Sequence, residues 1–243
     1  MPLRSFTRSF EPRILTPLVT SSNSTRIWNK GITMSVFRAS LQHNDTYAFR
    51  DYSVVTWNQQ VHQELVPDMS GNSHEGIHRC DRCGELTSKW DEPLLGVNIN
   101  KRKYDLSITY DGVLIASEKF KSVYAANNLL GLEFRRLPND TQFFAIHATR
   151  TVEFDAERRK TRFIKPCQKC GRCESVVGAK PVFLKTGSVV DDHEFVRTDL
   201  EFGSGDEKHP LLICGKVAAK AICNAKLKGV DLTPIEEDLC SKT

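Results

Sequence analysis

The sequence predicts an α/β (α+β) protein made of two related lobes, and two observations carry this prediction. A Cys-x-x-Cys-Gly motif occurs twice, at residues 80–84 and 167–171, and one 25-residue segment has a counterpart farther along the chain. A chain of 243 residues is long enough for two lobes of about 100 residues that each bury a core. We expect the first lobe at residues 34–140 and the second at 141–240, each carrying one motif.

The repeated segment predicts the same strand-turn-helix-strand unit in each lobe. Residues 113–137 read VLIASEKFKSVYAANNLLGLEFRRL and align without a gap, at an offset of 98, with residues 211–235, LLICGKVAAKAICNAKLKGVDLTPI. Each copy begins with an apolar triplet that suits a strand, and the i, i+3, i+4, i+7 spacing that follows predicts a helix. Gly131 and Gly229 are expected to end these helices as C′ residues, because glycine tolerates the left-handed backbone there.

Further strands are expected around these units. Asp-Leu pairs at Asp105 and Asp199 predict matching strand entries, provided that the second copy contains a four-residue insertion. Aromatic and β-branched residues favour strands within residues 35–57 and 142–155. Residues 67–78 are rich in Gly, Ser, Asn and His, which is typical of a loop, and they lead into the first cysteine motif.

The two cysteine motifs predict one metal site. Two cysteines separated by two residues can offer both thiolates to one cation from a tight turn, and tetrahedral Zn²⁺ prefers four such soft ligands. The glycine after the second cysteine suits a turn whose backbone N–H groups point toward the sulfur atoms. We therefore expect Zn²⁺ as a cofactor in a zinc-knuckle (zinc-ribbon-like) element that joins the two lobes, with the ligands Cys80, Cys83, Cys167 and Cys170.

Other uses of the eight cysteines stay open at this point. Disulfides suit a secreted protein, and the chain has no convincing secretory signal. A redox dithiol would need one motif directly after a strand and at the start of a helix, and neither motif lies at such a place. A redox pair also does not explain why the motif occurs twice. Two separate metal sites, completed by Cys173, His78 or His193, are compatible with the spacing.

The remaining cysteines have simpler interpretations. Cys214 and Cys223 fall opposite alanines of the first copy, so they suit small apolar positions in a core. Cys240 lies in a polar tail and predicts nothing.

Composition and charge indicate an ordinary globular protein. The formal net charge is +4, and 40% of the residues are hydrophobic. The longest apolar stretches are far below the roughly 20 residues that span a bilayer, so we expect no membrane association and a cytoplasmic location. Residues 1–33 are rich in Arg, Ser, Thr and Pro; they suit a disordered leader, a transit peptide or a start assigned upstream of Met34.

The sequence favours a protein without enzymatic activity. Acidic residues and a histidine at residues 191–194 come nearest to a catalytic cluster, but neighbours in one short segment point in different directions, and the composition suits a surface turn.

A basic segment offers an alternative function, because its cations could bind the phosphates of a nucleic-acid partner, as in a zinc-ribbon nucleic-acid-binding protein. Nearby acids weaken that positive field. The basic residues are Arg158, Arg159, Lys160 and Arg162.

The assembled motifs resemble the double-CXXCG-motif proteins, known mainly from myxobacteria, whose relatives include immunity proteins against contact-delivered toxins. The resemblance covers residues 77–235 and rests on His78-Arg-Cys-Asp-Arg-Cys-Gly84, on the segment FIKPCQKCG at residues 163–171 and on FVRTDLEFGSG at 195–205. It implies a non-enzymatic α/β protein whose four motif cysteines bind zinc and whose partner is a protein, such as a toxin that it neutralises. The long leader and Cys173 depart from the family pattern.

Overall fold

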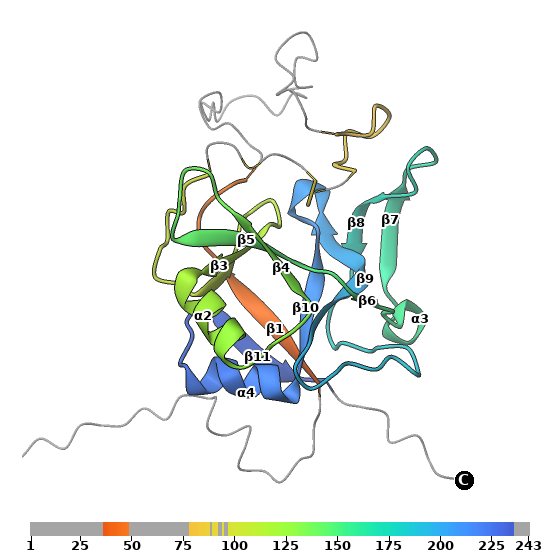
Figure 1. Cartoon of the computed structure of the whole chain (residues 1–243). Helices are drawn as coiled ribbons and strands as arrows, with labels where there is room; N and C mark the ends of the chain where they lie inside the picture. Colours follow the sequence, from red (N-terminus) through yellow and green to blue (C-terminus); the bar gives the residue numbers. More distant parts are fainter. Residues whose placement is uncertain (1–35, 49–77, 88, 92–93, 95–96, 236–243) are drawn as a thin grey trace, which may run out of the picture. The chain divides into compact units, whose positions relative to one another are not determined.

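The structure is a computed structural model that describes residues 36–48, 78–87, 89–91, 94 and 97–235 (Figure 1). All of these residues belong to one compact unit, Thr33–Thr243. The expected leader, most of the expected 67–78 loop and Cys240 lie outside the described residues. The described part of the chain is strand-rich with a few helices, in agreement with the predicted mixed α/β class.

Within the described residues, eleven strands form one sheet in the order β4-β5-β3-β2-β1-β10-β9-β8-β7, with β11 paired to β1 and β6 paired to β9. Three α-helices and one 3-10 turn connect them. The elements are β1 (Val36–His43), β2 (Leu106–Ile108), β3 (Leu114–Ser117), α2 (Glu118–Ala126), β4 (Leu132–Arg136), β5 (Phe143–Ala148), β6 (Thr151–Val152), α3 (Ala156–Arg159), β7 (Arg162–Pro166), β8 (Cys173–Val177), β9 (Phe195–Ser204), η2 (Gly205–Glu207), β10 (His209–Gly215), α4 (Lys216–Asn224) and β11 (Val230–Pro234).

Both helices expected from the repeated segment are present, and each connects two strands. α2 joins β3 to β4, and α4 joins β10 to β11. The Ser117 hydroxyl accepts a hydrogen bond from the Phe120 N–H (3.2 Å) and so caps the start of α2. Gly215 is the N-cap of α4. The helical spacing therefore predicted the right elements.

The helices end earlier than predicted. Asn128 and Lys226 follow the C-caps and have left-handed backbones, with φ of 49° and 50°. The prediction that Gly131 and Gly229 end the helices was wrong, because both glycines lie directly before the next strand.

Gly131 and Gly229 instead permit a close approach between backbones. Their φ angles are 86° and 87°, and a Cβ atom on either residue would lie 2.1 Å from a backbone oxygen. That oxygen belongs to Phe195 for Gly131 and to Leu106 for Gly229. Only glycine fits, so these contacts bring the chain before β4 against β9 and the chain before β11 against β2.

Two groups of four strands share one topology. The orders β4-β5-β3-β2 and β11-β1-β10-β9 correspond, and all neighbours within each group are antiparallel. The registers correspond too. Ser117 in β3 pairs with the first residue of β5, Phe143, and Gly215, its equivalent at the offset of 98, pairs with the first residue of β1, Val36. β1, which comes from the first expected lobe, thus lies among strands of the second and takes the position that β5 has in the first group.

The predicted strand entries at Asp105 and Asp199 do not correspond. By register against β3 and β10, Leu106 in β2 matches Phe195 at the start of β9. Asp199 lies inside β9, four residues beyond that start. The similarity of the two Asp-Leu pairs therefore does not reflect equal places in the sheet.

α2 and α4 lie side by side, and aromatic side chains pack between α2 and the sheet (Figure 1). Phe120 is fully buried, and its ring centroid lies 5.9 Å from that of Phe195 and 6.2 Å from that of Phe134. Side chains alternate along a strand, so the other face carries separate apolar clusters. One of them contains Leu86, Leu94, Val97, Ile99, Val113, Ile115, Leu137, Phe143 and Ala145.

Candidate metal centre

Each cysteine motif forms the turn of a small hairpin. In the first, Arg79 pairs with Leu86, and in the second Pro166 pairs with Cys173. Both turns are closed by the same hydrogen bond, from the N–H of the motif glycine to the carbonyl of the first cysteine, at 2.8 Å and 2.9 Å. We call these hairpins, residues 79–86 and 166–173, the first and second knuckle.

The motif glycines, Gly84 and Gly171, have φ angles of 73° and 72°. No atom lies within 4 Å of a Cβ built on either one. The knuckles therefore need glycine for its backbone conformation and not for space.

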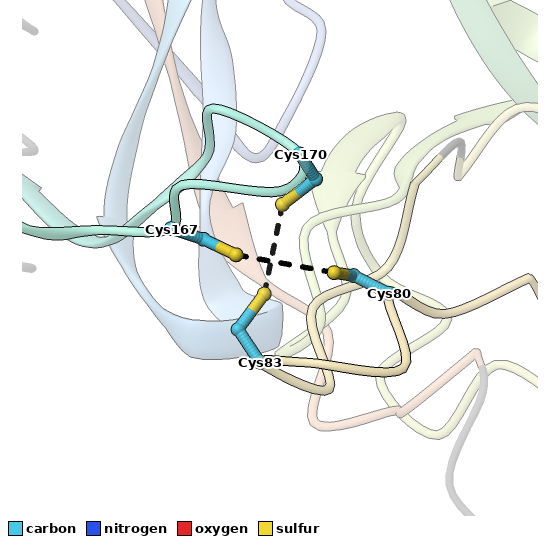
Figure 2. Close-up of side chains that lie close together, drawn as sticks. All are labelled: Cys80, Cys83, Cys167 and Cys170. Carbon is cyan, nitrogen blue, oxygen red and sulfur yellow. Dashed lines mark hydrogen bonds between the residues drawn. The ribbon is translucent and has the colours of Figure 1, made fainter.

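The two knuckles bring four sulfur atoms together (Figure 2). The Sγ atoms of Cys80 and Cys167 are 4.0 Å apart, and those of Cys83 and Cys170 are 3.6 Å apart. All four lie within 4.8 Å of one another. Tetrahedral zinc with Zn–S bonds of about 2.3 Å needs sulfur atoms about 3.8 Å apart. The four cysteines thus form a group that could hold one metal ion.

Backbone N–H groups favour the thiolate form of one cysteine in each knuckle. The N–H groups two and three positions along the chain lower the pKa of Cys80, and the equivalent pair lowers the pKa of Cys167 to about 6. The Glu85 N–H also acts to lower the pKa of Cys83, but burial and neighbouring thiols together raise that pKa to about 12. Without a cation, four such close thiols cannot all be ionised, because each thiolate disfavours the next.

Polar contacts cross between the tips of the knuckles in a reciprocal pattern. The Lys169 ammonium lies 2.6 Å from an Asp81 carboxylate oxygen, and the Arg82 guanidinium donates to the Gln168 side-chain oxygen at 3.4 Å. The second position of each motif thus contacts the third position of the other. These contacts are exposed, so they contribute to register more than to stability.

Comparisons with protein-family models, with curated proteins and with solved structures found no match. Within the described residues, the structure also has no helix that is long and apolar enough to cross a membrane.

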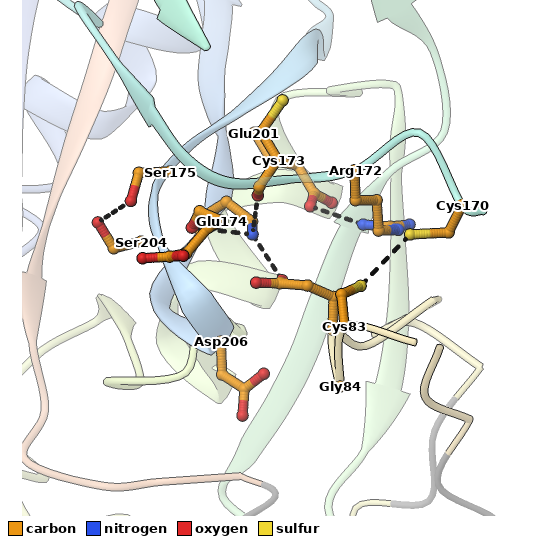
Figure 3. A network of polar contacts seen from close by, with 12 residues as sticks. Cys83, Gly84, Cys170, Arg172, Cys173, Glu174, Ser175, Glu201, Ser204 and Asp206 are labelled. Atoms are coloured by element: carbon orange, nitrogen blue, oxygen red, sulfur yellow. Dashed lines mark hydrogen bonds and ion pairs between the residues drawn. The ribbon is translucent and has the colours of Figure 1, made fainter. Parts of the chain in front are cut away.

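Polar contacts around Arg172, Cys173 and Glu201 lie beside the two knuckles (Figure 3). A buried lysine, Lys208, ties both knuckles to the sheet. The Lys208 ammonium lies 2.5 Å from the Glu85 carboxylate, directly after the first motif, and donates to the Cys173 carbonyl at 2.6 Å. The side chains of Lys208 and Glu85 are only 4% and 10% exposed. In the second knuckle, Arg172 pairs with Glu201 at 3.2 Å and also donates to the Thr87 carbonyl.

Sequence reasoning missed this support. Lys208 lies 123 residues from its partner Glu85, and neither residue belongs to a sequence motif. The one available signal is position, because Glu85 and Arg172 both follow a Cys-x-x-Cys-Gly motif directly.

The alternative ligands lie outside the sulfur group. Cys173 begins β8, and the described His78 and His193 do not join the group. The His193 imidazole instead lies 3.4 Å from the Asn127 carbonyl. Cys214 is fully buried, and burial raises the pKa of its thiol, which suits the small core position that the repeat predicted.

The acidic segment 191–194 forms a turn before β9 and has structural partners. Glu194 pairs with Arg150 at 2.5 Å, and the Asp191 carboxylate accepts a hydrogen bond from the His193 N–H at 2.8 Å. The Asp192 carbonyl accepts from the N–H groups that open α4. These contacts direct the side chains to different neighbours, as expected for a surface turn.

The basic segment contains the short helix α3 and the start of β7. The Arg158 guanidinium lies 4.0 Å from the centre of the Phe183 ring, and Arg159 is partly buried near Gly178. Lys160 and Arg162 are exposed. Two of the four cations therefore pack against the protein itself.

Proposed function

We propose that this chain is a zinc-stabilised, non-enzymatic protein-interaction protein in which one Zn²⁺ fastens the two knuckles together. The supporting observation is the convergence of four cysteine sulfurs from two hairpins whose cysteines are 87 residues apart in the chain. Four protein ligands fill a tetrahedral site, so no position is left for water or substrate. That arrangement suits a structural metal.

In this proposal the metal supplies stability that the knuckles lack by themselves. Within the described residues, direct contacts between the two knuckles come from the sulfur group and from the exposed contacts between their tips. Exposed polar contacts of that kind add little stability. A metal bound by the folded chain alone raises the free energy of unfolding, by about 4 kcal/mol when its concentration is 1,000 times the Kd.

The first test is metal content and stability of the purified full-length chain. We expect one zinc per chain by elemental analysis and a lower melting temperature after chelation. A variant with all four cysteines changed to serine should contain no zinc and should melt at the same temperature with or without chelator. Cys173→Ser is the matched control and should keep its zinc. Absence of zinc from the natural chain, together with unchanged melting of the four-serine variant, would refute the proposal.

The proposed partner is a protein, and the resemblance to immunity-type proteins supports a toxin as its class. A pull-down from lysate with the full-length chain, followed by co-expression with any toxin encoded beside the gene, tests this step separately from the metal. We expect stable binding and protection of cells that express both proteins. Binding of zinc without any binding or protection would leave the metal centre standing and overturn the immunity role.

A further inference from the structure

A cavity of about 400 Å³ opens on the sheet where β1 lies between β10 and β11. Its polar wall comes from β1 and β11 together with an exposed lysine that precedes a proline, Lys180. The side chains that matter here are Arg38, Ser40, Thr233 and Lys180. None of these residues belongs to the knuckles, so the cavity is a separate feature.

The corresponding place in the other group of four strands is solid core. By register, Arg38 in β1 matches Ala145 in β5, since Arg38 faces Ile213 and Ala145 faces Ile115. Ala145 is fully buried and packs in a cluster with residues from 86–99. The same sheet position thus carries a small core residue in one group and an arginine lining a cavity in the other.

The Arg38 guanidinium is half-buried and has no counter-ion in the part of the chain that the structure describes. Among the described residues, no acceptor takes a hydrogen bond from it and no carboxylate pairs with it. Burial alone lowers the pKa of Arg38, with no contribution from a neighbouring acid. Asp231 also lines the cavity, but it accepts a hydrogen bond from Gln42 at 3.0 Å. A partly desolvated cation of this kind is unfavourable until an anion compensates it.

We propose that this cavity binds a small molecule through its carboxylate or phosphate group, with Arg38 as the main ligand and Lys180 as the second cation. The guanidinium offers paired N–H donors that match either oxyanion, and the hydroxyl groups of Ser40 and Thr233 can hydrogen-bond the remainder of the ligand. The volume fits a small metabolite, because ligand cavities typically begin at about 300 Å³.

The test is calorimetric titration of the zinc-loaded full-length chain with two probes, inorganic phosphate and succinate, at fixed salt. We expect saturable binding of at least one probe, and the tighter one identifies the oxyanion. Arg38→Met should weaken that binding by about tenfold or more, because a charge-assisted hydrogen bond is lost. Arg38→Lys keeps the charge and should retain part of the affinity. Lys220→Met removes an exposed charge on α4, outside the cavity lining, and should bind like the natural chain.

Melting temperatures of the variants separate folding from binding. A folded Arg38→Met chain that binds phosphate and succinate as tightly as the natural chain would overturn the proposal. The same holds if neither probe binds the natural chain, or if Lys220→Met weakens binding as much as Arg38→Met does, because the attraction would then be a general charge effect.

Discussion

Lys208 carries a positive charge into the interior beside the first knuckle. Its ammonium contacts the Glu85 carboxylate at 2.5 Å and the Cys173 carbonyl at 2.6 Å, so one side chain touches both knuckles, the second at its last residue, where β8 begins. A buried charge is tolerated only with such partners, because its desolvation costs several kcal/mol. At the residue scale, this pair links the sulfur group to the sheet.

Replacing Lys208 therefore has a predictable cost. We expect Lys208→Met to lower the free energy of unfolding by roughly 3 kcal/mol or more, because the Glu85 carboxylate would stay buried without a cation. Adding Glu85→Gln should restore part of that loss. Urea unfolding of both variants gives the values, with the exposed Lys220→Met as control. A loss below about 1 kcal/mol for Lys208→Met would show that the pair is not buried as described.

The cysteines and their supporting residues differ in how far the sequence predicts them. A thiol pair at fixed spacing with a following glycine has few other uses, so Cys80, Cys83, Cys167 and Cys170 were predicted together, and the structure brings their sulfur atoms together. Lys208 carries no such signal, because lysines are mostly exposed and its partner is remote in sequence. Lys208 reaches Glu85 because tertiary packing places the turn between η2 and β10 beside the first knuckle.

At the element scale, the two glycines before β4 and β11 hold strands from different parts of the chain in contact. We expect Gly131→Ala and Gly229→Ala each to lower the free energy of unfolding by more than about 2 kcal/mol, since a Cβ would collide with a backbone oxygen and φ is positive. Gly84→Ala and Gly171→Ala are the matched controls. They have positive φ but open surroundings, so about 1 kcal/mol is expected in zinc-loaded protein. Equal losses at all four positions would contradict the close-approach explanation.

The turn before β9 gives a pH-dependent contribution. A hydrogen bond from Arg150 lowers the pKa of Glu194 below its ordinary value of 4.5. Because the pKa of Glu194 is lower in the folded chain than in the unfolded chain, its ion pair with Arg150 stabilises the fold fully above pH 4.5. This stabilisation is lost as the pH falls through the folded pKa.

Unfolding of the natural chain and of Glu194→Gln between pH 7 and pH 3 should therefore show a stability difference that shrinks in acid. A difference that stays constant over this range would mean that the carboxylate is not paired with Arg150.

Local patterns predicted the elements better than their boundaries or their pairing. The helical spacing gave α2 and α4, since an amphipathic period is a local property. The helix ends were misplaced, because Asn128 and Lys226 take the left-handed backbone that glycine usually takes. The position of β1 between β10 and β11 was not predicted, because strand pairing across most of the chain leaves no periodic signal.

At the scale of the whole molecule, two groups of strands with one topology meet in a continuous sheet, and the knuckles face each other beside it. The reciprocal contacts of Gly131 with β9 and Gly229 with β2 parallel the reciprocal contacts between the knuckle tips. This correspondence supports our proposal that the chain consists of two related lobes with the metal between them. The expected leader and tail lie outside the described residues and do not enter it.

X-ray absorption at the zinc edge of the purified full-length chain tests this account most directly. We predict one zinc per chain with four sulfur neighbours at about 2.3 Å, and three sulfur neighbours plus one lighter atom in Cys83→Ser. Nitrogen ligands in the natural chain, or two zinc ions per chain, would contradict a single site shared by the two knuckles.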